Sequence, residues 1–333
     1  MPVDSPSGTF REFLRTVARG PTLSRTLSAA EAEEALGLIL DGQALPMQVG
    51  AFLLVLRQRG ETAEELTGMA RAARYRAAIR AFPAADLDWP SYADAHRQLP
   101  YFLLAAKLVA QAGVRVVMHG GPGAGAASTR HGLAGLGLPT ARNADEVGEH
   151  LHRHGLAYLP LESLCPVLAE LFALKPVLGV RTAMNSVARE LNPAGAPAQI
   201  QGVFHPPYIP LHVETQMALG PVRALTFKGG GGEGQRNPDK PCRSMALVDG
   251  SVQELLWSQL TPCGWPWRDE PLEVARLRAL WEGAWSEPAP VAAVTGTAAM
   301  ALWLAGHVPD PKAADALAVT LWTERGRSLP RAA

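Results

Sequence analysis

The sequence predicts an α/β protein: a small all-helical N-terminal domain followed by a larger α/β domain with a central, mostly parallel sheet. Two observations support this class. The first eighty or so residues show only helical patterns, and the later chain alternates helical patterns with short β-branched runs. We expect the helical domain to cover residues 1–82 and the α/β domain residues 86–333. At 333 residues the chain is long enough for two such domains.

Three helices are expected in the N-terminal part. Ser28, followed by an acidic first turn, is a typical N-cap, and its helix runs to Asp41-Gly42. A buried helix is expected over residues 47–57, and another begins at Thr62 and continues to about Phe82. The order of these signals predicts a compact bundle before the sheet begins.

A segment from Phe82 to Pro90, with two prolines and a tryptophan, is predicted to be a linker between the domains. The strands expected beyond it are residues 114–117, 199–204, 224–227 and 245–248. A tryptophan-rich stretch follows, and its mixed charge and prolines favour core or interface packing over a base-stacking platform. Its members are Trp257, Trp265, Trp267, Trp281 and Trp285.

Charge and cysteine content exclude several classes. The formal net charge is +0, which argues against a generic polyanion binder. The three cysteines, Cys165, Cys242 and Cys263, are far apart and lack metal-ligand spacing, so neither a disulfide framework nor a structural zinc site is expected. This cysteine content favours a location in the reducing cytoplasm. We expect no signal peptide and no membrane span, because charged residues interrupt the longest apolar stretch, Tyr101 to Met118.

Two glycine-rich loops each follow a short apolar run. The first continues from Met118 into His119, Gly120 and Gly121, and the second is Lys228 followed by Gly229, Gly230, Gly231 and Gly232. Backbone N–H groups of such loops can converge on a phosphate, and the Lys228 ammonium can join them. The alternative is that both loops are only tight turns between strand and helix. His119 likewise either donates to phosphate or is a satisfied structural group.

A helix from about Thr62 carries a basic segment, since residues 66–85 contain no acid. Its arginines form two neighbouring pairs, Arg71 with Arg74 and Arg76 with Arg80. A solvated helix face is one interpretation, because exposed arginine is the rule. A basic patch facing a groove is the other.

Several segments of the chain together carry a family resemblance. They are residues 41–42, 48–52, 56–62, 112–120, 178–185, 191–194, 200–203 and 297–326. In this order they resemble anthranilate phosphoribosyltransferases and related nucleoside phosphorylases, the glycosyl transferase family 3. The resemblance implies a helical domain, joined by a helical segment near residues 160–190, that packs on an α/β domain. It also implies a ligand cleft between them and a homodimer through the helical domain.

The motifs that carry catalysis in this family are altered here. The position of the pyrophosphate-binding Gly-Thr-Gly-Gly-Asp loop reads Asp88 to Asp94, and that of the Asn-x-Ser-Thr element reads Pro100 to Leu103. The family's anthranilate-binding arginine falls on Lys175, a point charge in place of a bidentate fork. In place of the paired magnesium carboxylates, Glu233 supplies at most one, a poor metal site. We therefore expect no cofactor, with Mg²⁺ and phosphoribosyl pyrophosphate as the alternative.

These departures resemble a YbiB-type branch of the family, with Asp88 to Tyr92, Met118 to Gly120 and the Lys228 loop in its pattern. The resemblance implies a nucleic-acid-binding protein without sequence preference or anthranilate phosphoribosyltransferase activity, and single strands are the expected ligand. Cations can hold a phosphodiester backbone. Those assigned to this task are Arg71, Arg74, Arg76, Lys107, Arg130, Lys175, Lys228, Arg236, Lys240 and Arg243.

Two other functions remain open from the sequence. One is a glycosyl or phosphoribosyl transferase with an unfamiliar acceptor, in which His119 contacts acceptor or phosphate while Glu233 and Asp239 take a metal. The other is a structural dimer that binds neither ligand.

Overall fold

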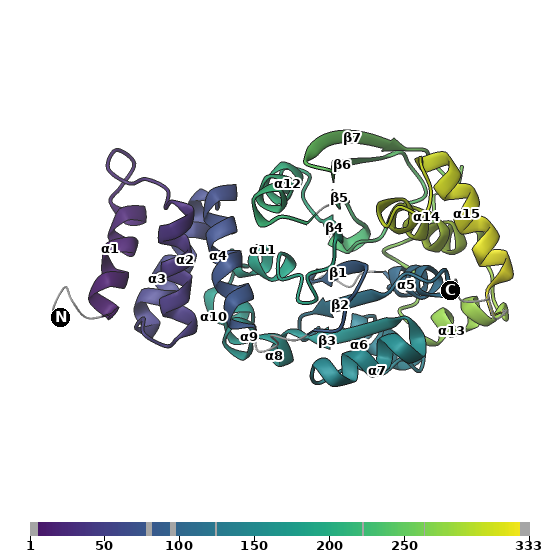
Figure 1. Cartoon of the computed structure of the whole chain (residues 1–333), viewed down its shortest axis with the longest axis horizontal. Helices are drawn as coiled ribbons and strands as arrows, with labels where there is room; N and C mark the ends of the chain where they lie inside the picture. The colour runs from purple at the N-terminus through teal and green to yellow at the C-terminus, as the bar shows by residue number, and fades with distance from the viewer. Residues whose placement is uncertain are drawn as a thin grey trace.

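The structure, a computed structural model, describes residues 6–77, 82–93, 98–123, 125–221, 223–262 and 264–326. It confirms the predicted class, with a helical N-terminal part and a larger part built around a seven-stranded, mostly parallel sheet. Figure 1 shows the helical part at one end of the long axis, the sheet in the middle and the last helices at the other end.

Four helices form the N-terminal part: α1 (Pro6–Ala18), α2 (Ala29–Leu40), α3 (Pro46–Arg59) and α4 (Ala63–Arg76). The predicted starts of α2 and α4 are confirmed. Ser28 and Thr62 each accept a hydrogen bond from the third residue of their helix, whose glutamate reaches back in a capping box. Local side-chain chemistry therefore sets where the bundle helices begin.

The sheet has the strand order β3-β2-β1-β4-β5-β6-β7. The first five strands in this order are parallel, and β5, β6 and β7 form an antiparallel meander. The strands are β1 (Leu87–Ser91), β2 (Val116–Gly120), β3 (Leu156–Pro160), β4 (Ala198–Val203), β5 (Arg223–Lys228), β6 (Cys242–Val248) and β7 (Ser251–Trp257). Parallel strands end at one edge, so the segments after β1 to β5 meet there.

The predicted linker from Phe82 to Pro90 is wrong, because it contains the central strand β1. A proline argued against a strand, since it cannot donate to the ladder. The backbone N–H of Leu87 donates to the carbonyl of Arg115, just before β2. Backbone N–H groups point to alternate sides along a strand, so the nitrogen of Pro90, three residues further on, faces β4. Pairing with β4 covers only Leu87 and Asp88, and the missing donor at Pro90 therefore costs no ladder bond.

Eleven further helices among the described residues cover the sheet and link its strands. They are α5 (Phe102–Gln111), α6 (Thr129–Gly135), α7 (Ala144–His154), α8 (Leu161–Leu164), α9 (Pro166–Phe172), α10 (Lys175–Leu178), α11 (Met184–Arg189), α12 (Tyr208–Leu219), α13 (Ala275–Glu282), α14 (Pro288–Leu304) and α15 (Pro311–Glu324). A short 3₁₀ turn, η1 (Gly230–Gly232), lies in the second glycine loop. No helix in the described part is long and apolar enough to cross a membrane.

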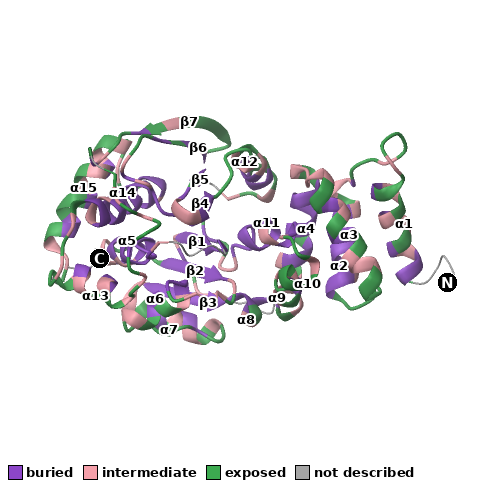
Figure 2. Ribbon diagram, turned by 180° about the vertical axis from the view of Figure 1, so that it is seen from behind, coloured by how far each residue is buried: buried purple, intermediate pink, exposed green. Residues whose placement is uncertain are grey.

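Two apolar cores lie on opposite faces of the sheet. Val116 and Met118 belong to the core under α5, α14 and α15, whereas Val117 between them belongs to the other core. That second core continues through α7, α8, α9 and α11 into the N-terminal helices. Figure 2 shows the buried residues gathered along the strands, while β7 at the sheet edge is largely exposed. The proposed division at residues 82 and 86 stays a prediction.

Candidate functional site

The two glycine loops lie at the edge of the sheet where the parallel strands end, but they face very different spaces. Lys228 and Gly229 to Gly231 line a cavity of about 1130 Å³. Beside Gly121 and Gly123 of the first loop, the hollow measures only about 20 Å³. That is room for about one water molecule. Among the described residues, the second loop therefore adjoins space for a substrate and the first does not.

The second loop needs glycine because it folds tightly onto β4. A Cβ at Gly229 or at Gly202 of β4 would collide with the carbonyl oxygen of Glu233. Gly231 and Gly232 have positive φ angles of 64° and 89°. The N–H groups of Gly229, Gly230, Gly232 and Glu233 donate to backbone carbonyls, so most of the loop's donors are used within the fold.

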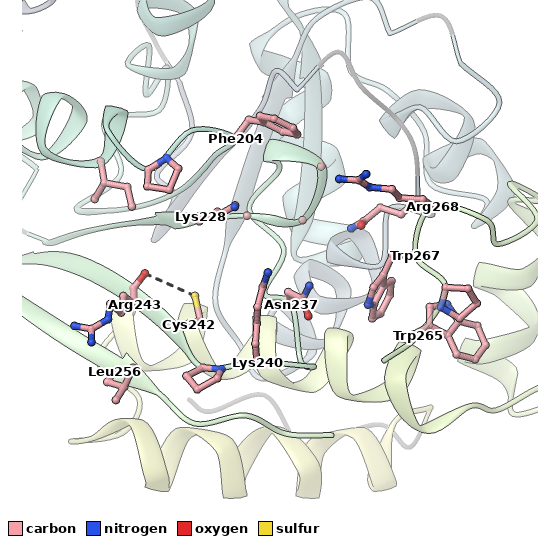
Figure 3. A pocket seen from close by; sticks show the side chains of 18 of the residues that line it. Phe204, Lys228, Asn237, Lys240, Cys242, Arg243, Leu256, Trp265, Trp267 and Arg268 are labelled. Atoms are coloured by element: carbon pink, nitrogen blue, oxygen red, sulfur yellow. Dashed lines mark hydrogen bonds between the residues drawn. The ribbon is translucent and has the colours of Figure 1, made fainter. Parts of the chain in front are cut away.

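Side-chain cations surround the space in front of this loop. Figure 3 shows the amino groups of Lys228 and Lys240 directed into the pocket and the Arg268 guanidinium entering from the opposite side. These three side chains are exposed, and none has an ion-pair partner among the described residues. In the part of the chain that the structure describes, Asp269 is the one carboxylate that lines this pocket. The pocket is therefore suited to an anionic ligand.

An aromatic wall faces the cations. The indole N–H of Trp267 donates to Asp239 Oδ2 at 2.6 Å, and that of Trp265 donates to Glu270 Oε2 at 3.2 Å. Both rings are thus fixed by their polar ends while their faces border the cavity with Phe204. The ring centroids of the two tryptophans are 6.3 Å apart in an edge-to-face arrangement.

The first loop is closed by buried side chains. Tyr92 and His119 share a hydrogen bond of 2.7 Å between the hydroxyl and Nδ1, and His119 Nε2 lies 3.2 Å from Asp88 Oδ1. His119 and Asp88 are both 0% exposed. A Cβ at Gly121 would come within 2.9 Å of the Phe172 ring, so this loop packs against α9. His119 does not line either cavity.

Side chains of the fold also take the donors at the start of α5, where the family resemblance implied a phosphate-binding element. The N–H of Phe102 donates to Gln235 Oε1 at 2.8 Å, and that of Leu99 donates to Glu270 Oε1 at 2.8 Å. The Tyr101 hydroxyl donates to the second oxygen of Glu270 at 2.8 Å. A buried carboxylate of the protein therefore takes donors that could otherwise hold an anion.

Glu233, the one predicted metal ligand in this loop, is 5% exposed. Its Oε1 accepts the N–H of Ala93 at 2.9 Å. Burial raises the pKa of Glu233 to about 7, although the charge of Arg189 and the Ala93 hydrogen bond act in the other direction. No group of three or more histidines, cysteines, aspartates and glutamates in the described part could hold a metal ion.

The other predicted site residues lie apart from the cavity. Arg71 and Arg74 donate to the carbonyls of Ala218 and Glu190, which ties α4 to the α/β part, and Arg80 lies outside the described residues. Arg76 makes a bidentate ion pair with Asp41, at 2.6 Å for each bond.

Three further cations are likewise held by the fold. The Lys107 ammonium lies 4.3 Å from the ring centroid of Trp281, and Arg130 pairs with Glu162 at 2.7 Å. Arg236 is fully buried and pairs with Asp315 at 2.7 Å. Lys175 is exposed at the start of α10 and does not line the cavity. Of the assigned cations, the structure brings Lys228, Lys240 and Arg243 to one pocket.

Sequence reasoning missed Arg268 and the fact that the partly buried rings of Trp265 and Trp267 line the pocket. The signal was the run Trp265-Pro266-Trp267-Arg268, in which a proline interrupts any regular element and leaves aromatic and basic side chains on a loop. The core-packing interpretation is confirmed for Trp257, Trp267, Trp281 and Trp285, which belong to or pack against the core under α14.

Comparison with known domains gives two matches in sequence order. Residues 11–77 match the helical bundle domain of a glycosyl transferase family, and residues 102–324 match the a/b domain of a glycosyl transferase family.

Curated relatives and solved structures agree with these matches. The chain is 32% identical to an anthranilate phosphoribosyltransferase of Erythrobacter litoralis, covering 88% of this chain and 91% of the relative. It is 27% identical to the anthranilate phosphoribosyltransferase structure from Thermus thermophilus, with a TM-score of 0.77 over 93% of this chain and 94% of that one. The Saccharomyces cerevisiae enzyme in complex with PRPP and Mg has a TM-score of 0.76 at 16% identity, over 95% and 94% of the chains, a likeness of fold.

These relatives correct the prediction of a nucleic-acid-binding protein. Curated relatives that cover most of the chain are phosphoribosyltransferases, so the interpretation as a binder of single-stranded nucleic acid is wrong. The structure gives a physical reason for the error. Arg71, Arg74, Arg76, Arg130 and Arg236 bond to carbonyls or carboxylates of the fold and do not form one basic surface.

Proposed function

The chain belongs to the glycosyl transferase family built from a helical bundle domain and an a/b domain, and we propose that it is a pentosyl transferase of the phosphoribosyl class. The relative from Erythrobacter litoralis, 32% identical over 88% of the chain, supports this assignment. The proposed donor is a pentose that carries a diphosphate on its anomeric carbon, and the acceptor is a nucleophile to be identified by assay.

The observation that carries the proposal is the cation-lined pocket at the carboxyl edge of the sheet. In the proposed reaction the bond from the anomeric carbon to the diphosphate oxygen breaks, and its electron pair leaves with the diphosphate. The acceptor donates a lone pair to the anomeric carbon and releases a proton. Lys228, Lys240 and Arg268 are placed to stabilise the charge that develops on the leaving diphosphate.

The cavity is large enough for donor and acceptor together. Its volume of about 1130 Å³ exceeds the several hundred Å³ typical of a single small-molecule site. The rings of Trp265, Trp267 and Phe204 line the same pocket as the cations. We therefore place the acceptor against these rings and the diphosphate against the cations.

Magnesium accompanies PRPP in the yeast complex, and the residues here do not fit it. Mg²⁺ takes oxygen ligands in octahedral geometry. Glu233 is buried against Ala93, and Asp239 accepts hydrogen bonds from Thr261 and from Trp265 and Trp267. The Asp239 carboxylate is committed to these hydrogen bonds. Glu233 Oε2 has no hydrogen-bond partner among the described residues, but this side chain is 5% exposed and does not line the pocket, so no step above passes through a metal.

A direct assay tests the proposal. Phosphoribosyl pyrophosphate is incubated with the protein and a panel of acceptors that begins with anthranilate, and released pyrophosphate is measured. Acceptor-dependent release supports the proposal, and Lys228→Ala should slow it by about tenfold or more. If no acceptor produces release above the protein-free rate, the assignment as a transferase is wrong.

The expected loss of anthranilate phosphoribosyltransferase activity falls with the nucleic-acid-binding interpretation, because the relatives above are anthranilate phosphoribosyltransferases. Two further expectations stay predictions: the cytoplasmic location and the homodimer through the helical part. Fractionation of cells tests the first, and light scattering coupled to size-exclusion chromatography tests the second.

A further inference from the structure

The walls of the main pocket separate charges by sign. Its cationic side chains face the ligand space, whereas the carboxylates of Asp239 and Glu270 beside it accept hydrogen bonds inside the wall. This separation determines what kind of anion the pocket can hold and whether a metal ion can accompany that anion.

Three carboxylates form the inner layer of the wall. Asp239 accepts hydrogen bonds from the Thr261 hydroxyl at 2.8 Å, from the backbone N–H of Trp265 at 3.0 Å and from the indole N–H of Trp267 at 2.6 Å. Glu270 accepts from Leu99, Tyr101 and Trp265. These contacts anchor the segment from Trp265 to Glu270 against α5 and the loop after Arg236.

The third carboxylate, Glu233, lies under the glycine loop. It is 5% exposed, accepts from the Ala93 N–H and has Arg189 nearby. Among the described residues that line the cavity, Asp269 is the one acid against the four bases Lys228, Lys240, Arg243 and Arg268. The described lining is therefore net positive, which disfavours a divalent cation, and Asp269 is the single carboxylate that these residues offer as a ligand for Mg²⁺.

The outer layer offers charges placed for a polyanion. Lys228 and Lys240 approach the space in front of the glycine loop from one side, and Arg268 approaches it from the other. Lysine ammonium groups act as point charges on phosphate, and the arginine fork can bind two oxygens of one phosphate. Three cations that converge from two sides match a ligand with two linked phosphates better than a monophosphate.

We propose that this pocket binds a diphosphate-bearing ligand in its metal-free form, with Lys228, Lys240 and Arg268 supplying the positive charge that a divalent cation would otherwise supply. The proposal deepens the proposed function and rests on it. It predicts that Mg²⁺ does not improve binding, because a magnesium complex of the diphosphate carries less negative charge to the lysines and arginine. It also predicts that a diphosphate binds more tightly than orthophosphate.

Calorimetric titration of the full chain with inorganic pyrophosphate and with phosphoribosyl pyrophosphate tests this, once in EDTA and once in excess Mg²⁺. We expect binding in EDTA to be at least as tight as in Mg²⁺. The double variant Lys228→Ala/Lys240→Ala should weaken it by tenfold or more. Lys312→Ala, which removes an exposed lysine on α15 outside the pocket, should leave the affinity unchanged. Circular dichroism checks that the variants fold, and exposure of all three side chains makes this the expected result.

The outcomes separate the two proposals. Binding of either ligand only in the presence of Mg²⁺ overturns the metal-free site and leaves the transferase assignment standing. Metal-free binding that the double variant weakens, without pyrophosphate release in the acceptor panel, supports the site and removes the transferase. Equal affinities of the double variant and the Lys312→Ala control would show that the ligand binds elsewhere, and the proposal would then be wrong.

Discussion

The hydroxyl of Tyr92, directly after β1, lies 2.7 Å from Nδ1 of His119 near the end of β2. Both side chains are buried, and their rings meet edge to face with centroids 5.3 Å apart. His119 Nε2 lies 3.2 Å from Asp88 Oδ1, so a proton on Nε2 can donate to that carboxylate while Nδ1 accepts from the tyrosine. Burial raises the pKa of Tyr92 well above its usual value, which keeps this hydroxyl a donor. This pair closes the half of the sheet edge that the first glycine loop occupies.

Breaking this hydrogen bond should cost stability. His119→Leu leaves the Tyr92 hydroxyl buried without a partner, and we expect a loss of about 1–3 kcal/mol in the free energy of unfolding, measured by urea denaturation. Tyr92→Phe and the double variant complete the cycle. The double variant should lose less than the two single losses added together, since neither polar group is then left alone. Strictly additive losses would show that the two groups are not coupled.

The buried carboxyl of Glu233 should make stability depend on pH. Its pKa of about 7 in the folded protein lies above the ordinary value of 4.5, so in between the folded chain holds a proton that the unfolded chain releases. The contribution of Glu233 to the free energy of unfolding is therefore greatest below about pH 4.5, falls as the pH rises to 7, and stays low above pH 7. At about 1.4 kcal/mol per pKa unit, the whole fall is ~3 kcal/mol.

Glu233→Gln should remove that fall, because an amide stays neutral. Urea denaturation at pH 5 and pH 8 should show the variant gaining on the native chain by up to ~3 kcal/mol at the higher pH. Glu254→Gln, on the exposed strand β7, is the control and should follow the native pH profile. A variant whose stability changes with pH as the native protein's does would contradict a buried neutral carboxyl at this position.

Gly202 allows the second glycine loop to lie on β4. A Cβ added at Gly202 would collide with the Glu233 carbonyl oxygen, a backbone atom that cannot rotate away. Gly202→Ala should therefore destabilise the protein by about 1–3 kcal/mol. We also expect weaker pyrophosphate binding, because the loop that carries Lys228 must move. Gly50→Ala in α3 is the matched control: its Cβ would meet nothing within 4 Å, and helix propensity predicts a gain of up to about 1 kcal/mol. Thermal unfolding of both variants measures the difference, and equal effects would disprove the close approach.

Glu270 should hold the tryptophan wall in place. In the native chain one oxygen of Glu270 accepts from Leu99, and the other accepts from Tyr101 and Trp265. Glu270→Gln replaces one of these oxygens with an NH₂ group, so at least one donor loses its partner. We expect a loss of about 1–3 kcal/mol in stability and a shift in tryptophan fluorescence as Trp265 loosens. Glu273→Gln, an exposed neighbour, should change neither measurement. An unchanged spectrum for Glu270→Gln would mean that this carboxylate does not orient the indole.

Part of the site could be predicted from the sequence because its signals are local. A lysine followed by four glycines after an apolar run identified the Lys228 loop, which does line the main cavity. The same reasoning failed for the His119 loop. Its glycines serve close packing on Phe172 of α9, a contact between residues about fifty positions apart. The strand β1 was missed for a related reason, since only the pairing pattern shows that Pro90 faces a position without a ladder bond.

The sequence alone determined the class of fold, the capped starts of α2 and α4 and the place of the second glycine loop. Each of these depends on side chains within a few residues of one another, where propensity and capping act. Only the tertiary structure decided which of the two glycine loops faces an open cavity. That choice depends on how distant segments pack: Tyr92 and Phe172 fill the space beside β1 and β2, and Glu270 ties Trp265 to the residues just before α5. Both sets of contacts join residues whose proximity no local pattern encodes. Among the described residues they leave the glycine loop after β5 beside an open cavity and the loop after β2 beside a hollow of about 20 Å³.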